Sequence, residues 1–359
     1  MTAEPVDRRE WEEVETYVLN HPQGSVFHLP GWYNALEREN GRPVVCLCCR
    51  DYNRCIRGIF PLLGTRGLPF GIGKTAGSRR LSSLPRTPFC GPLADDKKTA
   101  DLLIEKAMAI STRDSVATLQ YKSMDGTLLP DGGMVHRVVW RKSLVKIFPE
   151  PGERLTFGNP RNNGRIENGI RKAVRSGISI AELVDREELP VWYRLYVQTM
   201  RRHLIPARSL RFFLSLWDNF HAKKHMKIIC ARKENTLIAG SIFLLFNDRA
   251  FYAFNGSNYR FRTLRANDAI LWHFQQNAHH KGFRHLDLGE VADGNDGLFA
   301  FKHKWGVVER TIYHYYYPAA VQHQDTRGGG RLDTVLATIW KHVPAPVTEF
   351  AGAIINRYL

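Results

Sequence analysis

The sequence predicts an α/β (α+β) protein that contains two tandem copies of one fold, each a mixed, mostly antiparallel sheet flanked by helices. The chain has 359 residues, which is too many for one ordinary domain and suits two. Hydrophobic residues make up 43% of it, enough to build two buried cores. An internal repeat and the order of helices and strands in the second half predict this architecture.

The repeat is an ungapped match between residues 46–63 and 228–245. Each copy predicts a β-hairpin with a polar turn centred on Asn53 or Asn235 and a single glycine in the second strand, which marks a bulge or a close backbone approach. Both copies follow an aromatic helical stretch, at 27–36 and 210–220. The identical pairs are Cys48/Cys230, Arg50/Arg232, Asn53/Asn235, Ile56/Ile238, Gly58/Gly240, Leu62/Leu244 and Leu63/Leu245. We interpret the match as a duplication; the alternative is a chance likeness of two hairpins.

The second half presents its elements in the order helix, helix, hairpin, strand, helix, strand, helix, strand. A clear helix is expected over 267–281, where Asn267 suits the N-cap, Asp268 complements the helix dipole and Gly282 suits the position after the end. The other expected elements are helices over 192–200, 210–220 and 298–305, a hairpin over 227–246, and strands over 250–255, 284–288 and 307–317. This order predicts a mixed sheet rather than a doubly wound parallel one. We place the domains at 1–157 and 158–321, followed by a tail at 322–359.

The formal net charge of +16 requires an anionic partner, such as phosphate, nucleic acid or a membrane surface. Part of it lies in a helix expected over 159–177 between the two halves, which Gly164 and Gly169 are expected to weaken. Two interpretations stay open: a solvated bridging helix, or contact with a phosphorylated or polyanionic substrate. The cations of this segment are Arg161, Arg165, Arg171, Lys172 and Arg175.

Several classes of protein are excluded. The longest apolar run, 236–246, is about half of the roughly 20 residues that a membrane span needs. The N-terminal segment lacks the apolar stretch of a signal peptide, so a cytoplasmic location is expected. Six cysteines do not make a disulfide framework in this length, and neither they nor the 14 histidines have metal-ligand spacing, so no metal is expected.

Three motifs follow one another in the second half. Gly256-Ser257 leads through a basic-aromatic loop to Asn267; Asp287-Leu288-Gly289 closes a strand; and Gly297-Leu-Phe-Ala-Phe-Lys302 precedes Trp305. Together they resemble the signature of the FemAB-like aminoacyl- and acyltransferases, a group of tandem proteins with an acetyltransferase (GNAT-like) fold. The similarity is closest to the subgroup linked with exosortase and exopolysaccharide systems. It covers roughly residues 20–320, with the tight motifs at 196–306.

The resemblance implies two GNAT folds and the transfer of an acyl or aminoacyl group to an amine acceptor, in cell-envelope or exopolysaccharide metabolism and without a metal. The peptidoglycan branch of the family draws on aminoacyl-tRNA. GNAT enzymes draw on acetyl-CoA and bind its pyrophosphate with a glycine-containing loop, whereas the equivalent loop here, 260–267, has three arginines and no glycine. This argues against standard coenzyme A binding. No tightly bound cofactor is expected, and the donor stays open among acyl-CoA, aminoacyl-tRNA and an acyl carrier.

Two alternatives come from other classes of function. One is an acetyl-CoA-dependent N-acetyltransferase that acts on a small amine or amino sugar. The other is a non-catalytic module that binds nucleic acid or another polyanion through its basic surface, although no recognised nucleic-acid motif is present.

Lys302 is the first candidate catalytic residue. Helical spacing places Lys302 next to Leu298, Phe301 and Trp305, at the edge of a buried stripe. The same spacing directs His303 and Lys304 away from that stripe. A half-buried ammonium there would stabilise a developing oxyanion or a phosphate. The alternative is a lysine that extends from the edge of the core into solvent.

Two carboxylates at the end of the 284–288 strand are candidates for the base that takes a proton from the amine. Asp287 faces away from Leu286 and Leu288, and Glu290 follows Gly289. A structural pair between Asp287 and an arginine is the alternative.

The donor-binding candidates are Arg262, Arg265, Tyr259 and Asn267, just before and at the start of the 267–281 helix. The free amides of a helix N-terminus and neighbouring arginines bind anions. We expect Asn267 to act as a cap more than as a ligand. A solvated basic loop is the alternative.

The tail joins a flexible linker, 322–330, to two amphipathic helices expected over 332–343 and 347–358. These helices have three possible places: on the body, against another chain, or on an anionic membrane, which would make the protein peripheral on the inner membrane face.

Overall fold

The computed structural model describes residues 1–66, 79–130, 135–291 and 296–318. They form two compact units: Met1–Arg141 with 311–318 make unit 1, and Lys142–Arg310 make unit 2. Strands β7 (His136–Ile147) and β13 (Val307–Tyr317) each supply one end to each unit. Unit 1 therefore consists of two separate stretches of the chain. The boundaries predicted at 157 and 321 instead describe two continuous domains. Those boundaries stay predictions, and the tail lies outside the described residues.

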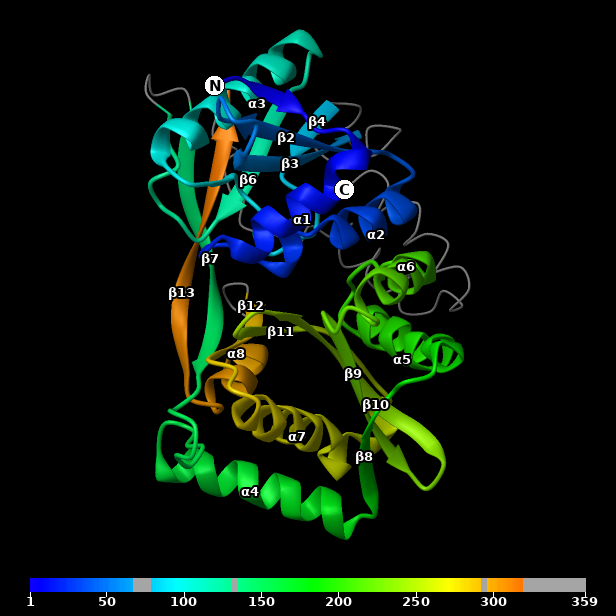
Figure 1. Ribbon diagram of the computed structural model, residues 1–359. Helices are drawn as coiled ribbons and strands as arrows, with labels where there is room; N and C mark the ends of the chain where they lie inside the picture. The colour runs from blue at the N-terminus through cyan, green and yellow to red at the C-terminus, as the bar shows by residue number, and fades with distance from the viewer. Residues whose placement is uncertain (67–78, 131–134, 292–295, 319–359) are drawn as a thin grey trace, which may run out of the picture. The chain divides into compact units, whose positions relative to one another are not determined.

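Unit 1 is a mixed sheet with the strand order β1-β2-β3-β4-β6-β13, in which β5 also pairs with β3. Figure 1 shows α3 on one face of this sheet and α1 and α2 on the other. Strands β4 and β6 are parallel and joined through α3, whose Leu103, Ile104 and Ala107 are buried in the core. The strands are Ala3–Pro5, Val44–Arg50, Ile56–Arg66, Arg79–Ser82, Leu93–Ala94 and Thr118–Ser123 (β1 to β6), and the helices are Trp11–Asn20, Pro30–Asn40 and Lys97–Arg113 (α1 to α3).

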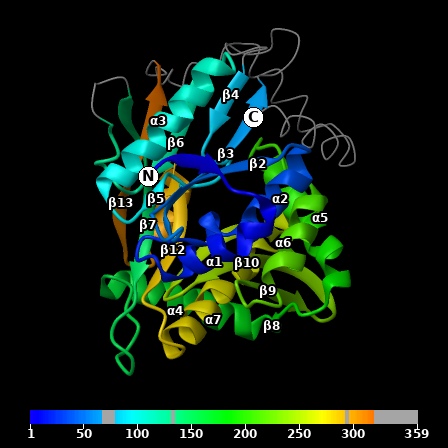
Figure 2. The ribbon, with the colours of Figure 1, turned by 45° about the horizontal axis from the view of Figure 1, so that its top comes forward.

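Unit 2 has the strand order β7-β12-β11-β10-β9-β8. Strands β11 and β12 are parallel and joined through α7, and the other neighbours are antiparallel. Figures 1 and 2 show α7 against the sheet and α4 outside α7, while α5 and α6 lie on the opposite face. The strands are Ile178–Glu182, Met226–Lys233, Thr236–Phe246, Arg249–Ser257 and His285–Val291 (β8 to β12), and the helices are Pro160–Arg175, Leu189–Arg202, Leu210–Phe220, Ala266–His280 and Asp296–His303 (α4 to α8).

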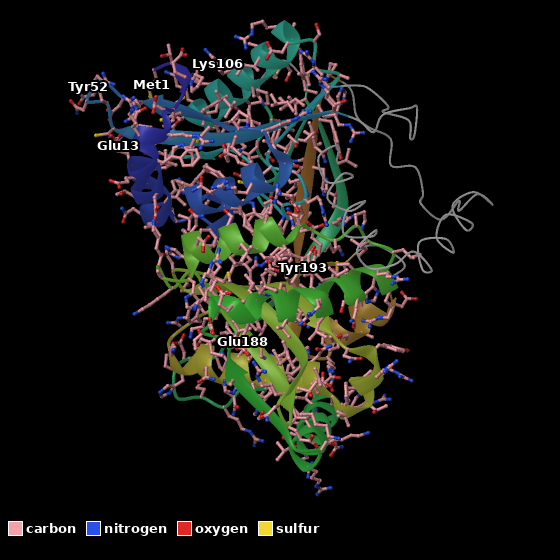
Figure 3. The ribbon with its side chains drawn as sticks, turned by 90° about the vertical axis from the view of Figure 1, so that its right-hand side faces the viewer. Met1, Glu13, Tyr52, Lys106, Glu188 and Tyr193 are labelled. Carbon is pink, nitrogen blue, oxygen red and sulfur yellow. The ribbon has the colours of Figure 1, made fainter. Side chains whose placement is uncertain are left out.

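Two glycines allow α5 to pack closely on the sheet of unit 2. A Cβ atom at Gly240 would lie 2.6 Å from the Trp192 ring, and one at Gly256 would lie 2.6 Å from the backbone nitrogen of Tyr196. Glu188, just before α5, binds Arg232 of β9. The Tyr193 hydroxyl of α5 donates to the Arg208 carbonyl at 3.1 Å (Figure 3). These contacts fix α5, whose last residue is Arg202.

Both predicted hairpins are present, as β2–β3 and β9–β10. Their registers differ by one residue, because Gly58 pairs with Cys49 whereas Gly240 pairs with Cys230. A shift of one residue moves a side chain to the other face of a strand. Gly58 accordingly abuts Thr99 of α3, whereas Gly240 abuts α5. The repeated glycine thus marks a close approach in both copies, but to different layers.

The helix and strand predicted over 210–220 and 307–317 coincide with α6 and β13. The predicted 27–36 stretch is divided instead into a 3₁₀ turn at Val26–His28 and α2, which starts at Pro30 because proline suits the first helical turn. The prediction that Asn267 caps its helix is wrong: α7 begins at Ala266, and Arg265 occupies the N-cap with a left-handed φ of 61°.

Helix α4 starts as predicted, with the Asn159 side chain accepting from the Asn162 amide at 2.9 Å. Its glycines differ in role. Gly164 has open space around it, whereas a Cβ atom at Gly169 would lie 3.2 Å from Asp268 Oδ2. Gly169 therefore brings α4 close to α7, and the helix packs on unit 2 rather than standing free as a bridge.

Candidate active site

The four predicted donor-binding residues line one pocket of about 230 Å³ in unit 2. We call it the arginine pocket, because three guanidinium groups border it. The lining includes Arg202, Ser257, Tyr259, Arg262, Arg265, Asn267, Asp268 and Phe301.

The pocket forms where β11 passes into α7. The Asn258 side chain accepts from the Arg260 amide at 3.1 Å and so starts the 3₁₀ helix η4 (Tyr259–Leu264). The left-handed turn at Arg265 then starts α7 with no side-chain cap on its first turn. The first amides of an α-helix have no partner within it, and Ala266 and Asn267 both line the pocket. The Asn267 side chain instead accepts from Asn255 at 3.3 Å.

Arg202 is a pocket residue that the sequence analysis did not assign. Its guanidinium carbon lies 4.9 Å from the centroid of the Tyr259 ring, and that of Arg262 lies 4.3 Å from the same centroid. Such cation–π contacts hold guanidinium groups in place. Burial lowers the pKa of Arg202 from its usual value. The signal in the sequence was that Arg202 lies within the 196–306 stretch of the family resemblance.

Asp268, which lines the pocket, is buried with two cations. Arg265 Nε lies 2.8 Å from Asp268 Oδ2, and Lys304 Nζ binds Asp268 Oδ1. Asp268 is 2% exposed and Lys304 is 6% exposed. Burial lowers the pKa of Lys304, while the Asp268 charge opposes this effect.

The prediction that Lys304 points away from the core is therefore wrong. Helix α8 ends at His303, so Lys304 lies in the following turn and no longer follows the helical spacing. Leu298 also differs from its prediction, because it is exposed rather than buried. Phe301 is half-buried and Trp305 is fully buried, as expected.

Lys302 connects α8 with the end of β12. Its Nζ donates to the carbonyls of Gly289 and Glu290 at 3.1 and 3.0 Å. The side chain is buried, and burial lowers the pKa of Lys302 to about 8, while the charges of Asp287 and Glu290 partly oppose the shift. Lys302 is thus an enclosed ammonium bound to backbone oxygens.

Asp287 is also buried, and it bonds to a serine hydroxyl and a backbone amide, whereas the alternative interpretation was a pair with an arginine. It accepts from the Ser143 hydroxyl and, at 2.6 Å, from the Gly289 amide. Burial raises the pKa of Asp287, and these hydrogen bonds and Lys302 partly oppose the shift. The pairing with β7 is irregular here, and Gly289 has a φ of 81°, so the strand bulges where Lys302 binds it.

The predicted residues therefore form two clusters. Tyr259, Arg262, Arg265 and Asn267 lie together at the arginine pocket, and Lys302, Asp287 and Glu290 lie together at the β12 bulge. Helix α8 supplies both, because Phe301 lines the pocket and Lys302 binds the bulge. Within the residues that the structure describes, no three His, Cys, Asp or Glu side chains are grouped to hold a metal ion.

Comparisons with known proteins show what the chain is similar to. Residues 161–303 match the model of an acetyltransferase (GNAT) domain. Over 320 residues, the chain is 23% identical to the UDP-N-acetylmuramoylpentapeptide-lysine N(6)-alanyltransferase of Weissella viridescens, covering 81% of this chain and 88% of that protein. The crystal structure of FemX gives a TM-score of 0.67 at 14% identity, covering 95% and 100% of the two chains. That of L-PGS from Bacillus licheniformis gives 0.57 at 11% identity, covering 94% and 97%.

These matches support a FemAB-like family for the chain. It is an enzyme, an N-acyltransferase of the GNAT type, and the predicted fold of two GNAT-like parts with mixed sheets is confirmed. The GNAT match begins in α4 and ends at the last residue of α8, so it contains all seven predicted site residues.

Proposed function

We propose that this protein forms an amide by moving an aminoacyl group from a polyanionic donor to an amine of a cell-envelope precursor. The arginine pocket carries this proposal. Three guanidinium groups and the amides of the first turn of α7 border one small cavity, and this combination suits a phosphate group.

We propose aminoacyl-tRNA as the donor, in preference to acyl-CoA or an acyl carrier. The loop 260–267 lacks the glycines of the coenzyme A motif, and the curated relative transfers an alanyl group. In the reaction, the amine attacks the ester carbon, the carbon–oxygen bond to the RNA breaks, and the leaving oxygen takes up a proton. An acetyl-CoA-dependent reaction is the second candidate, because residues 161–303 match the GNAT domain.

The β12 bulge supplies the proposed catalytic groups. A lysine has three N–H donors, and the carbonyls of Gly289 and Glu290 take two of those of Lys302. We propose that the third donor stabilises the oxyanion of the tetrahedral intermediate. Glu290 is half-exposed and suits the base that receives the proton of the amine, whereas buried Asp287 holds the bulge in shape through the Gly289 amide.

For the acceptor, we propose the lysine amine of a peptidoglycan precursor, since the relative from Weissella viridescens acts on a UDP-N-acetylmuramoylpentapeptide. An amine of an exopolysaccharide is the alternative that follows from the sequence resemblance. The reaction would take place in the cytoplasm, with the 322–359 tail on the anionic inner membrane face. Among the described residues, no helix combines the length and apolar character needed to cross a bilayer.

Product analysis tests the proposal. The full chain is incubated with a lysine-containing UDP-N-acetylmuramoylpentapeptide and, separately, with alanyl-tRNA, acetyl-CoA or an acyl-carrier thioester. We expect mass spectrometry to show one added alanyl group with the tRNA donor. An acetyl product would assign the second candidate instead, and no product with any donor or with an amino-sugar polymer as acceptor would refute both.

The membrane part of the proposal has its own test. Sedimentation with anionic vesicles compares the intact protein with a form that ends at Arg327. Equal binding of the two forms would exclude the tail as the membrane contact.

A further inference from the structure

An exposed side of α4 carries a row of four cations and one asparagine. Arg161, Arg165, Asn168, Lys172 and Arg175 are all exposed and follow the spacing i, i+4, i+7, i+11, i+14. This spacing places them on one side of an α-helix. At 1.5 Å per residue, the row is about 21 Å long. We call these five residues the α4 basic row.

A different side of α4 packs on the rest of unit 2. Ile166, Gly169 and Ala173 are buried where the helix packs on α7. Glu167, the acidic residue of α4, points to a different side and lies 3.5 Å from Arg154. The basic row is therefore not neutralised by its own helix.

The C-terminal part of the row borders a hollow of about 340 Å³. Its lining residues are Asn168, Arg171, Lys172, Arg175 and Ser176. Three cations next to an amide and a hydroxyl group are the side chains that bind the phosphates of nucleic acids.

Helix α4, which carries the row, packs next to Asp268 and Arg265 of the arginine pocket within unit 2. A Cβ atom at Gly169 would lie 3.2 Å from Asp268 Oδ2 and 3.4 Å from Arg265 Nε, and α4 also contacts η4. Figure 1 shows α4 alongside α7. Arg165 lies about one turn before Gly169 on the helix. Burial lowers the pKa of Lys304, and the charges of Arg265 and Arg165 add to the shift, which places Arg165 within electrostatic reach of this cluster.

We propose that the α4 basic row binds the phosphodiester backbone of an RNA whose acylated end occupies the arginine pocket. This inference rests on the proposed function and names the surface that holds the body of the donor. An anionic membrane is the competing partner. A helix that lies on a membrane inserts an apolar face, and the apolar face of α4 is buried against α7.

The test compares two double variants of the full chain. Lys172→Ala/Arg175→Ala removes two charges from the row, and Lys98→Ala/Lys281→Ala removes two exposed charges from α3 and the end of α7. The affinity for a fluorescent RNA hairpin with a single-stranded 3′ end is measured over a range of salt concentrations. We expect the row variant alone to bind less tightly, with a slope of log K against log salt that is smaller by about 1.5. Unchanged binding, or the same loss in the control variant, would overturn the proposal.

Measurements of turnover distinguish a failure of this proposal from a failure of the proposed function on which it rests. The row variant should raise the KM for alanyl-tRNA and leave the KM for an aminoacylated trinucleotide unchanged, because the short donor reaches the pocket but not the row. If no RNA donor supports turnover, the proposed function fails, while RNA binding still tests the row. If phosphatidylglycerol vesicles, and not the hairpin, lose affinity for the row variant, then α4 contacts membrane and the proposal is wrong.

Discussion

Lys304 and Asp268 form a buried ion pair that joins the turn after α8 to the first turn of α7. Asp268 also binds Arg265 of the arginine pocket. One carboxylate thus fixes a pocket residue and the segment that carries Lys302. Asp268 in this way links the arginine pocket to the segment that also contributes to the β12 bulge cluster.

Removal of Lys304 should strongly destabilise unit 2. Lys304→Met leaves the Asp268 carboxylate buried with one cation fewer, so the free energy of unfolding should fall by about 3–5 kcal/mol. The control is Arg284→Met, which breaks an exposed pair with Glu150 and should lower the free energy of unfolding far less. Chemical denaturation measures both. Equally small losses would show that the buried pair is not a structural requirement.

Lys302→Gln should lower turnover by about 100-fold or more, because it removes the charge proposed to stabilise the oxyanion. The amide of glutamine keeps a donor for the bulge carbonyls, and circular dichroism checks that the fold is retained. His303→Ala, at the exposed neighbour on α8, is the matched control. Parent-like turnover of Lys302→Gln would refute the role of Lys302.

The buried Lys302 should also make stability depend on pH. Its pKa is about 8 in the folded protein against the usual 10.5, so the unfolded chain binds more protons between these values. The free energy of unfolding therefore rises with pH from about 8 to 10.5, by up to about 3 kcal/mol. Lys302→Met lacks this rise. The difference between parent and variant isolates Lys302, because Lys146, whose pKa burial also lowers to about 8, is present in both. A constant difference from pH 7 to 10.5 would contradict the assignment.

Arg262→Ala should weaken donor binding about 10- to 100-fold, the value of one charge-assisted hydrogen bond. Arg260 provides a close control, because it lies in the same loop, is exposed and does not line the pocket. Isothermal titration with the donor, or the KM for the donor, distinguishes the Arg262→Ala and Arg260→Ala variants. The same loss for Arg260→Ala would mean that only the overall charge of the loop matters.

The two glycines of α4 should respond oppositely to substitution. Gly169→Val forces methyl groups against Asp268 and Arg265 and should cost about 1–3 kcal/mol. Gly164→Ala enters open space and should stabilise the helix by up to about 1 kcal/mol. Thermal or chemical unfolding measures both changes. A neutral Gly169→Val would show that α4 can move away from α7, Asp268 and Arg265 without cost.

The sequence by itself determined the features that depend on neighbouring residues. Helical spacing and strand alternation located α6 and β13, the repeat located both hairpins, and the run of arginines before α7 located the pocket loop. These features follow from local periodicity and turn chemistry, which a single sequence displays directly.

Only the tertiary structure decided which distant residues meet. Arg202 joins the pocket because α5 packs on Gly240 and Gly256, and Lys304 is buried because α8 ends one residue before it. Gly169 looked like a weak point of α4 and is instead its closest approach to α7. The register of the two hairpins, which sends equivalent glycines to opposite faces, also depends on pairing across strands. Such contacts join segments far apart in the chain, so no local pattern specifies them.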